Sequence, residues 1–371
     1  MWPWWGMAHG SDRSLEEKQP RYRWTPLKQA NQVVKLREPW FGGDEVEFAA
    51  IVVSQHTRDF YDRARDGSRE YQDHAAGLFG THAMLSEAHI LHRVLYEDHL
   101  RQGDLGDCRV IILSNAACLS EDECESLRQF VAGGGLLIGS YESTLFDPHG
   151  KRRDDFALAD VFGVSFRERV SRPGGDVRRG LIMSDTSLTG GIEHISIGAR
   201  HCLIEAADGA QVLAVSDGFG GNEPDVAAIV RHGFGEGEAV YFAEDVGPSY
   251  WARPYPWTRD LVAGMALRRT PPVVVDGPTV LHINALRSGS ELRVHLLNLP
   301  FATNRMVNRG AMATIEEVVP LHDVVVRVNE GAYSTALAAI ADRELALRET
   351  ADGALEVTVP RVEEHEIVVF S

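Results

Sequence analysis

The chain has 371 residues, enough for two or three domains, and its 44% hydrophobic and 25% charged residues are ordinary for a soluble globular protein. Its formal charge of −17 argues against nucleic acid as a partner, because an acidic surface repels phosphate. No apolar run is long enough to cross a bilayer, and residues 1–10 lack the basic start and apolar core of a signal peptide. We therefore expect a cytoplasmic protein that binds neither nucleic acid nor membrane.

Four cysteines occur, and none belongs to a paired CxxC motif or to a metal-binding spacing. In a reducing compartment they should remain free thiols. The sequence predicts no metal and no cofactor. The four are Cys108, Cys118, Cys124 and Cys202.

Residues 1–45 differ in composition from the rest of the chain, since they hold five of the seven tryptophans. A helix is expected over Trp24–Leu36, with apolar side chains on one face, and Pro39 and Gly42–Gly43 end it. A segment this short cannot bury several tryptophans alone. It must pack on the rest of the chain or on a domain that is absent.

The next part of the chain predicts an α/β sheet, because apolar runs alternate with amphipathic segments. A helix is expected over His74–His89. This alternation is typical of a flavodoxin-like strand order, with polar loops at the carboxyl ends of the strands. The expected strands are Phe48–Ser54, Leu91–Tyr96, Arg109–Leu113 and Leu136–Ser140.

The clearest local signal is the helix between the last two of these strands. Ser120 and Glu123 have the spacing of a capping box, in which each side chain bonds the backbone N–H of the other residue. Leu127, Phe130 and Val131 form an apolar stripe at helical spacing. Gly133–Gly135 then ends the helix, because glycine adopts left-handed backbone conformations readily.

After residue 140 the regular alternation lapses. A hairpin signal occurs over Ala227–Val246, where two apolar strands flank a glycine-rich turn. The other expected elements are a turn at Asp147–Gly150, a short helix over Phe156–Phe162, strands at 201–206 and 211–216, and a closing helix over Trp257–Leu267.

The last hundred residues read as all-β. Pro271, Pro272 and Pro278 predict an extended linker, because proline donates no ladder hydrogen bond. Beyond it apolar and polar residues alternate over short stretches with turns such as Ser288–Gly289 and Asp352–Gly353. Residues 273–371 are therefore predicted to form an antiparallel β-sandwich.

The middle of the chain resembles the trimerisation domain of family 42 β-galactosidases and related glycoside hydrolases. The resemblance rests on the glycine-rich helix end, the strand after it, an Asp-Phe-Ala-Leu-Ala-Asp insertion and a Phe-Gly-Val helix end. Here these are Gly133–Gly135, Leu136–Ile138, Asp155–Asp160 and Phe162–Val164. The hairpin and the closing sandwich also look like the family's, so the resemblance covers residues 46–371. It implies a class I glutamine-amidotransferase-like fold.

The resemblance also implies what should be missing. In such hydrolases a catalytic barrel comes first and carries the catalytic carboxylates, but about 45 residues precede the resembling region here, and a barrel needs roughly 200 or more. We expect a non-catalytic portion that mediates homo-oligomerisation, as a dimer or trimer, and shapes a carbohydrate cleft. Activity would require a barrel from missing sequence or a separate chain. The expected domains are 1–45, a remnant of a barrel, then 46–270 and 271–371.

The residues of the α/β region also indicate that it lacks a catalytic site of its own. Amidotransferase chemistry needs a thiolate on the sharp turn after a strand and a histidine base held by a carboxylate. That turn falls at Tyr141–Ser143, and Glu244 and Asp245 have no histidine beside them. Cys118 follows a different strand and is read as a small, half-buried hydrophobe. We therefore assign no catalytic residue.

Two other readings stay open. Glu142 and Asp147 could form a paired-carboxylate site of a self-contained hydrolase, although loop carboxylates of an acidic protein are usually solvated. Histidines also recur between residues 74 and 99, but their spacing matches no recognised metal pattern, so solvated or capping roles are expected. These are His74, His82, His89, His92 and His99.

Carbohydrate contacts are predicted in two places. Gln55, His56 and Arg58 come after a strand at its carboxyl end, where α/β domains bind ligands, and with Glu142 they are candidates for the rim of a cleft. The alternative for this segment is a helix-capping loop. The cluster Trp2, Trp4 and Trp5 suits stacking on a sugar face, and the alternative is packing against a barrel.

Overall fold

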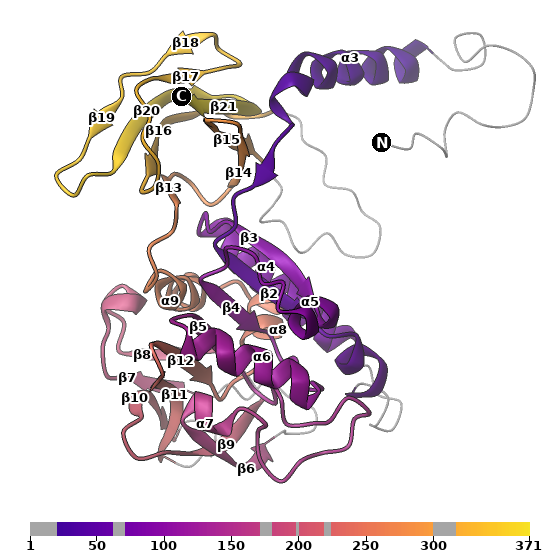
Figure 1. The fold of residues 1–371 in the computed structure, drawn as a ribbon, viewed down its shortest axis with the longest axis vertical. Helices are drawn as coiled ribbons and strands as arrows, with labels where there is room; N and C mark the ends of the chain where they lie inside the picture. The colour runs from indigo at the N-terminus through magenta and orange to yellow at the C-terminus, as the bar shows by residue number, and fades with distance from the viewer. Residues whose placement is uncertain (1–20, 62–70, 171–179, 198–199, 219–223, 300–316) are drawn as a thin grey trace, which may run out of the picture.

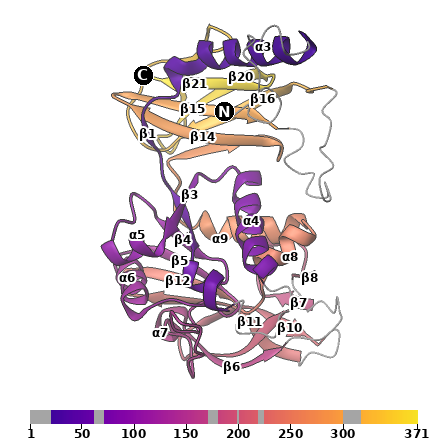
Figure 2. The same ribbon diagram turned by 90° about the vertical axis from the view of Figure 1, so that its right-hand side faces the viewer.

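The computed structural model describes residues 21–61, 71–170, 180–197, 200–218, 224–299 and 317–371. They form an α/β body and a β-sandwich stacked on one end of it (Figure 1). Figure 2 shows the same two parts from the side, with a narrow joint between them. The predicted fold class, a flavodoxin-like sheet followed by an all-β sandwich, is confirmed.

The α/β body is built on one nine-stranded sheet of order β3-β2-β4-β5-β12-β11-β10-β7-β8. Its first five strands are parallel, and their order is that of flavodoxin-like folds. They are β2 (Ala49–Val53), β3 (His92–Tyr96), β4 (Val110–Leu113), β5 (Leu136–Ser140) and β12 (Gly237–Phe242).

Antiparallel strands extend this sheet on one side, which makes it mixed rather than purely parallel. The predicted hairpin is the pair β11–β12, with Gly235 in the left-handed region at its turn. The added strands are β7 (Gly180–Met183), β8 (His194–Ser196), β10 (Gln211–Asp217) and β11 (Pro224–Phe234). A separate two-stranded sheet joins β6 (Val164–Val170) to β9 (His201–Ala206).

Helices cover both faces of the sheet. On one face lie α5 (Glu97–Gln102), α6 (Glu121–Ala132) and the short α7 (Ala159–Phe162), and on the other α4 (Tyr71–Glu87), α8 (Val246–Ala252) and α9 (Pro256–Ala266) (Figure 2). The predicted capping box of α6 is confirmed, because the Ser120 hydroxyl accepts from the Glu123 N–H and the Glu123 carboxylate from the Ser120 N–H. The sequence predicted a hairpin that ends at Val246 and a helix that begins at Trp257, so α8 is an element that the sequence did not predict.

The sandwich consists of two antiparallel sheets. One has the order β1-β14-β15-β21-β17-β18 and the other β13-β16-β20-β19. Its strands are β1 (Asp44–Glu45), β13 (Val273–Asp276), β14 (Leu281–Ser288), β15 (Glu291–Asn298), β16 (Leu321–Val328), β17 (Ala336–Ala338), β18 (Arg343–Glu344), β19 (Arg348–Glu349), β20 (Leu355–Val362) and β21 (His365–Phe370). The proline-flanked segment is thus not a bare linker, since its valines form β13 and pair with β16.

The N-terminal segment contributes to the sandwich rather than to the α/β body. Strand β1 pairs with β14 and extends the larger sheet at its edge. The predicted helix exists as α3 (Arg21–Arg37), which projects beyond the sandwich (Figure 1). Its apolar side chains Val33, Val34 and Leu36 are 39%, 43% and 77% exposed, so the described residues do not bury this face.

Two further expectations from the sequence concern the thiols and the membrane. The four cysteines are free and buried. Among the described residues, no helix is long and apolar enough to span a membrane.

Candidate functional site at the carboxyl edge of the parallel strands

The loops after β2, β4, β5 and β12 leave the sheet at the same edge, because these strands are parallel. In α/β sheets this edge is where ligands bind. The predicted rim residues come from two of these loops, Gln55, His56 and Arg58 after β2 and Glu142 after β5.

The loops after β2 and β4 are joined by two hydrogen bonds, and a third orders the β2 loop itself. The Ser54 hydroxyl donates to the Cys118 carbonyl over 3.0 Å, and the Thr57 N–H donates to the Ser54 oxygen over 2.9 Å. The Cys118 N–H in turn donates to the Thr57 hydroxyl over 2.9 Å. Cys118 is fully buried, whereas the sequence predicted a half-buried small hydrophobe.

The three predicted rim residues after β2 lie on one turn. Gln55 is exposed, and Arg58 forms an ion pair with the neighbouring Asp59 at 2.9 Å. The His56 N–H donates to the Glu97 carboxylate over 3.0 Å, and its imidazole lies 3.9 Å from Glu123. Glu97 opens α5, so part of this turn's bonding serves to fix the first turn of that helix. A contact with carbohydrate here stays a prediction.

Glu142 lies behind this rim rather than at its surface, with 1% of the residue exposed. Its carboxylate accepts a hydrogen bond from the hydroxyl of Tyr61, which is itself buried. This bond joins the end of the β2 loop to the β5 loop. Tyr61 was not among the residues singled out in the sequence, and the separation of 81 positions between the two explains why no local pattern reveals the pair.

The sharp turn after β5 is occupied by Tyr141. Its φ of +54° is the left-handed conformation that nucleophiles adopt at strand-to-helix elbows, and Thr144 three residues on has φ +67°. The ring is buried beneath the Arg200 guanidinium, 5.6 Å from the ring centre. Burial, reinforced by the nearby Glu142, raises the pKa of Tyr141 far above its usual value. The elbow therefore presents a neutral phenol instead of a thiolate.

Ser143 is the remaining hydroxyl of this turn. Its oxygen lies 2.7 Å from the Ser140 carbonyl and 3.1 Å from the Leu113 carbonyl, both of which can only accept. Its proton is therefore held by the backbone. A serine nucleophile instead needs its proton directed at a base.

Two buried acids come directly after β12, namely Glu244 and Asp245. Asp245 forms an ion pair with Arg200, the same guanidinium that covers the Tyr141 ring. Arg200 thus joins the β12 loop to the elbow after β5, a role that nothing in its local sequence indicates. Asp147, considered as the partner of Glu142, instead accepts the N–H groups of His149 and Lys151 over 2.9 Å each and so closes its own turn.

The five histidines between residues 74 and 99 lie in different surroundings. His99 accepts from the Tyr96 N–H over 3.1 Å at the start of α5, which is a capping role, whereas His74 is buried in α4. His82 and His92 contact each other at 2.8 Å, and His89 contacts two carbonyls near the start of the sandwich. In the described part of the chain, no group of three or more His, Cys, Asp or Glu side chains is arranged to hold a metal ion.

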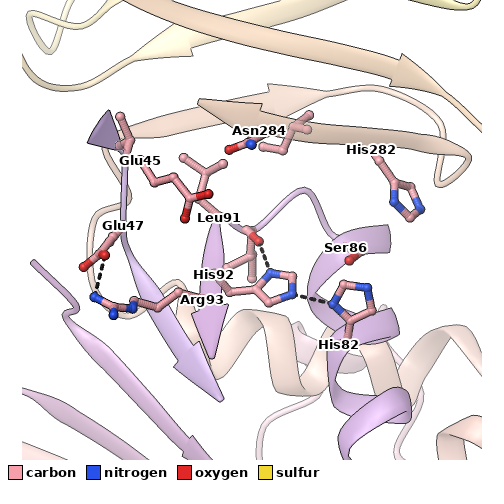
Figure 3. Close-up of a pocket in the computed structure, with 12 residues that line it drawn as sticks. Glu45, Glu47, His82, Ser86, Leu91, His92, Arg93, His282 and Asn284 are labelled. Carbon is pink, nitrogen blue, oxygen red and sulfur yellow. Dashed lines mark hydrogen bonds and ion pairs between the residues drawn. The ribbon is translucent and has the colours of Figure 1, made fainter. Parts of the chain in front are cut away.

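A cavity of about 240 Å³ lies at the joint between the α/β body and the sandwich (Figure 3). Strands β1 and β14 of the sandwich form one wall, and α4 and β3 form the other. Its lining is mainly polar and comprises Glu45, Val46, Glu47, His82, Ser86, Ile90, Leu91, His92, Arg93, His282, Ile283 and Asn284.

The comparison with protein families decides the assignment. The family model described as the β-galactosidase trimerisation domain matches residues 49–255, which is more than half of the chain. The chain belongs to the β-galactosidase trimerisation domain family. All nine strands of the trimerisation domain's sheet, and the carboxyl edge that carries the loops after β2, β4, β5 and β12, fall within the matched residues.

Solved structures share this fold. α-L-Fucosidase isoenzyme 2 from Paenibacillus thiaminolyticus matches with a TM-score of 0.71 and 16% identity over 96% of this chain and 54% of that chain. A catalytic mutant of Gan42B, a GH42 β-galactosidase from G. stearothermophilus, matches with a TM-score of 0.66 and 17% identity over 98% and 46%. The β-galactosidase from Bacillus circulans sp. alkalophilus gives 0.64 and 14% over 89% and 42%.

These matches extend beyond the trimerisation domain into the sandwich, since they cover nearly the whole chain. The chain spans about half the length of the solved structures that it matches. No curated protein matches it. The predicted sugar-stacking residues Trp2, Trp4 and Trp5 lie outside the described residues.

Proposed function

We propose that this chain is the non-catalytic part of a β-galactosidase-like glycoside hydrolase of carbohydrate metabolism, which mediates homo-oligomerisation and shapes the substrate cleft. The observation that carries the proposal is the membership of residues 49–255 in the trimerisation domain family. The elbow after β5 supports the non-catalytic role of this domain, because a buried neutral Tyr141 stands where amidotransferase chemistry would need a nucleophile.

The proposal includes a division of labour along the chain. Residues 46–270 would form the oligomerising α/β domain, 271–371 the closing sandwich, and 1–45 a remnant of a catalytic barrel that also supplies strand β1 to the sandwich. Gln55, His56 and Arg58 would contact carbohydrate at the cleft, with Glu142 fixing their loop from beneath through Tyr61. The location would be cytoplasmic, in keeping with the free cysteines.

Oligomerisation is tested by light scattering coupled to size-exclusion chromatography. The chain has a mass of 41.0 kDa, and we expect a dimer or trimer at micromolar concentration. A species of the single-chain mass across that range would contradict the oligomerising role.

The second candidate function is hydrolysis with a barrel supplied by missing sequence or a separate chain, by the retaining mechanism with two carboxylates. It is favoured by the likeness to glycoside hydrolases that are about twice as long. Adding such a barrel chain to this one should then create glycosidase activity that neither has alone.

A third candidate is a self-contained hydrolase that uses Glu142 at the strand ends. We expect no turnover of nitrophenyl glycosides by the isolated chain. Turnover that is lost in Glu142→Gln, but kept in the exposed control Glu363→Gln and on replacement of the N-terminal tryptophans, would overturn the non-catalytic assignment. Circular dichroism of Glu142→Gln checks that the variant is folded.

A further inference from the structure

Three histidines line the cavity where the sandwich meets the α/β body (Figure 3), and a fourth, His89, lies at the same joint. His82 on α4 and His92 on β3 belong to the body, whereas His282 on β14 belongs to the sandwich and points into the same cavity. His89, just beyond α4, contacts the segment around β13. Neither oligomerisation nor any of the candidate hydrolytic functions uses these side chains.

When both rings are neutral, the bond between His82 and His92 has one direction. The His92 Nδ1 lies 2.7 Å from the Ile90 carbonyl, which can only accept, so Nδ1 carries the proton. The His92 Nε2 is then a bare acceptor, and it receives the proton of His82 Nδ1 at 2.8 Å. A proton added to His92 would reverse this bond, because Nε2 would then donate to His82 Nδ1, and it would place a charged ring inside the joint.

His282 adds a third ring from the opposite side of the joint. Its Nε2 is buried without a hydrogen-bond partner among the described residues. No described carboxylate lies within 4.0 Å of the ring nitrogens of His82, His92 or His282. The carboxylate of Glu47, which also lines the cavity, is paired with Arg93 at 2.6 Å. Protonation would therefore place like charges together at the joint without a direct counter-ion.

Other charged groups around the joint act in both directions. Glu87 on α4 favours a charged His282 but is hydrogen-bonded to Tyr250, and Asp276 on β13 favours a charged His89. His89 itself lies 3.0 Å from the Val275 carbonyl and 3.2 Å from the Pro278 carbonyl, so only its protonated ring could donate to both. Glu45 on β1 and Arg93 on β3 also line the cavity.

Burial outweighs these attractions. It lowers the pKa of His92 to about 4 and moves the pKa values of His82, His89 and His282 below 6.5. Groups with depressed pKa values bind protons more readily once they are exposed to water. The stabilisation that they provide is present above pH 6.5 and is lost as the pH falls from 6.5 toward 4.

We propose that the interface between the α/β body and the sandwich is an acid-labile joint, in which protonation of His92, His82 and His282 releases the sandwich while both parts remain folded. His92 is the residue to test first, because both of its ring nitrogens are engaged, one with the Ile90 carbonyl and one with His82. Because the chain connects the two parts both near residues 46–48 and near residues 268–278, release would change their mutual arrangement, not their connection.

The test takes the full-length chain from pH 7.5 to 4.5 and measures small-angle X-ray scattering and far-UV circular dichroism on the same samples. We expect the radius of gyration to rise at a pH where the dichroism is unchanged. In His92→Gln, an amide can donate to Ile90 and accept from His82 without titrating. In this variant the rise in the radius of gyration should occur at a pH lower by about half a unit or more, because one fewer histidine takes up a proton on release.

His322→Gln is the matched control, since His322 is exposed on β16 and its Nδ1 lies 3.2 Å from the Pro360 carbonyl. It should leave the transition unchanged. If His92→Gln does not fold, His282→Gln provides the same comparison from the sandwich side. An unchanged midpoint in the folded joint variants, an equal shift in the control, or expansion only together with loss of dichroism would each overturn the proposal.

Discussion

At the scale of single residues, Tyr141 shows how one side chain determines what a sharp turn can do. The backbone at φ +54° is that of a nucleophile elbow, yet the phenol is buried and its hydroxyl has no hydrogen-bond partner among the described residues. With a pKa raised by burial, it cannot supply an anion near neutral pH. The strained turn is therefore retained without the chemistry that often accompanies it.

The Tyr61–Glu142 bond should be important for stability, because the Tyr61 hydroxyl donates to a carboxylate that is buried on the elbow loop. Tyr61→Phe leaves that carboxylate short of one donor, and we expect a loss of about 1–3 kcal/mol in the free energy of unfolding. Urea denaturation measures it. Tyr96→Phe is the control at an exposed tyrosine, and a loss as large there would show that the buried bond is not the cause.

His74 should make stability depend on pH. Burial lowers its pKa to about 4, with Glu97 acting in the opposite direction. Because the folded-state pKa lies below the unfolded value of about 6.5, its contribution is present above pH 6.5 and is lost as the pH falls toward 4.

Replacing His74 by Gln should therefore flatten the fall in urea midpoint between pH 6.5 and 4. His194→Gln, at an exposed position on β8, should leave the slope as in the wild type. Equal slopes for the wild type and His74→Gln would contradict the assignment of this dependence to His74.

At the scale of elements, the contact between α4 and α8 depends on glycine. A Cβ on Gly80 would overlap the carbonyl of Gly247, and one on Gly247 would overlap the carbonyl of Gly77. The obstructing atoms are backbone, which cannot rotate away as a side chain can. The two helices must approach this closely for α8 to lie over the sheet beside α9 (Figure 2).

Gly80→Ala should accordingly lower stability by several kcal/mol, even though alanine favours helix more than glycine does. Thermal and urea unfolding measure the effect. Gly233→Ala is the control, because a Cβ there meets nothing within 4 Å. A neutral or stabilising effect of Gly80→Ala would contradict the close approach of the α4 and α8 backbones.

At the scale of the whole molecule, one hydrophobic core runs from the α4 and α9 side of the sheet into the sandwich. Polar contacts reinforce this joint at its edge. Arg109, next to β4, donates to the Thr270 carbonyl over 2.7 Å and pairs with Glu330 of the sandwich. The two parts are thus connected by packing, by the chain and by this arginine.

Arg109→Ala should change the free energy of unfolding by no more than about 1 kcal/mol, because the pair is solvent-exposed. Cleavage of the segment near residues 268–278 by a protease should nevertheless become several-fold faster, because that segment loses a tether. Arg361→Ala breaks an exposed pair with Glu363 on the sandwich alone. Cleavage that is accelerated equally in both variants would contradict the tethering role.

The sequence by itself determined the features that depend on neighbours along the chain. The buried strands appeared as apolar runs, α6 as a capping box with a glycine stop, and the β11–β12 hairpin as two strands around a glycine turn. The flavodoxin-like order could be inferred because parallel strands need crossover helices. Two short helices, α5 and α8, were not predicted, since neither has a long apolar stripe at helical spacing.

Only the tertiary structure decided what depends on residues far apart in the chain. The pairing of β1 with β14, the bond from Tyr61 to Glu142 and the position of Arg200 over Tyr141 each join distant segments. The gathering of His82, His92 and His282 likewise requires both parts of the molecule to be docked. Local patterns report on backbone conformation and one buried face, whereas these contacts arise from the way whole elements pack, which no short stretch of sequence encodes.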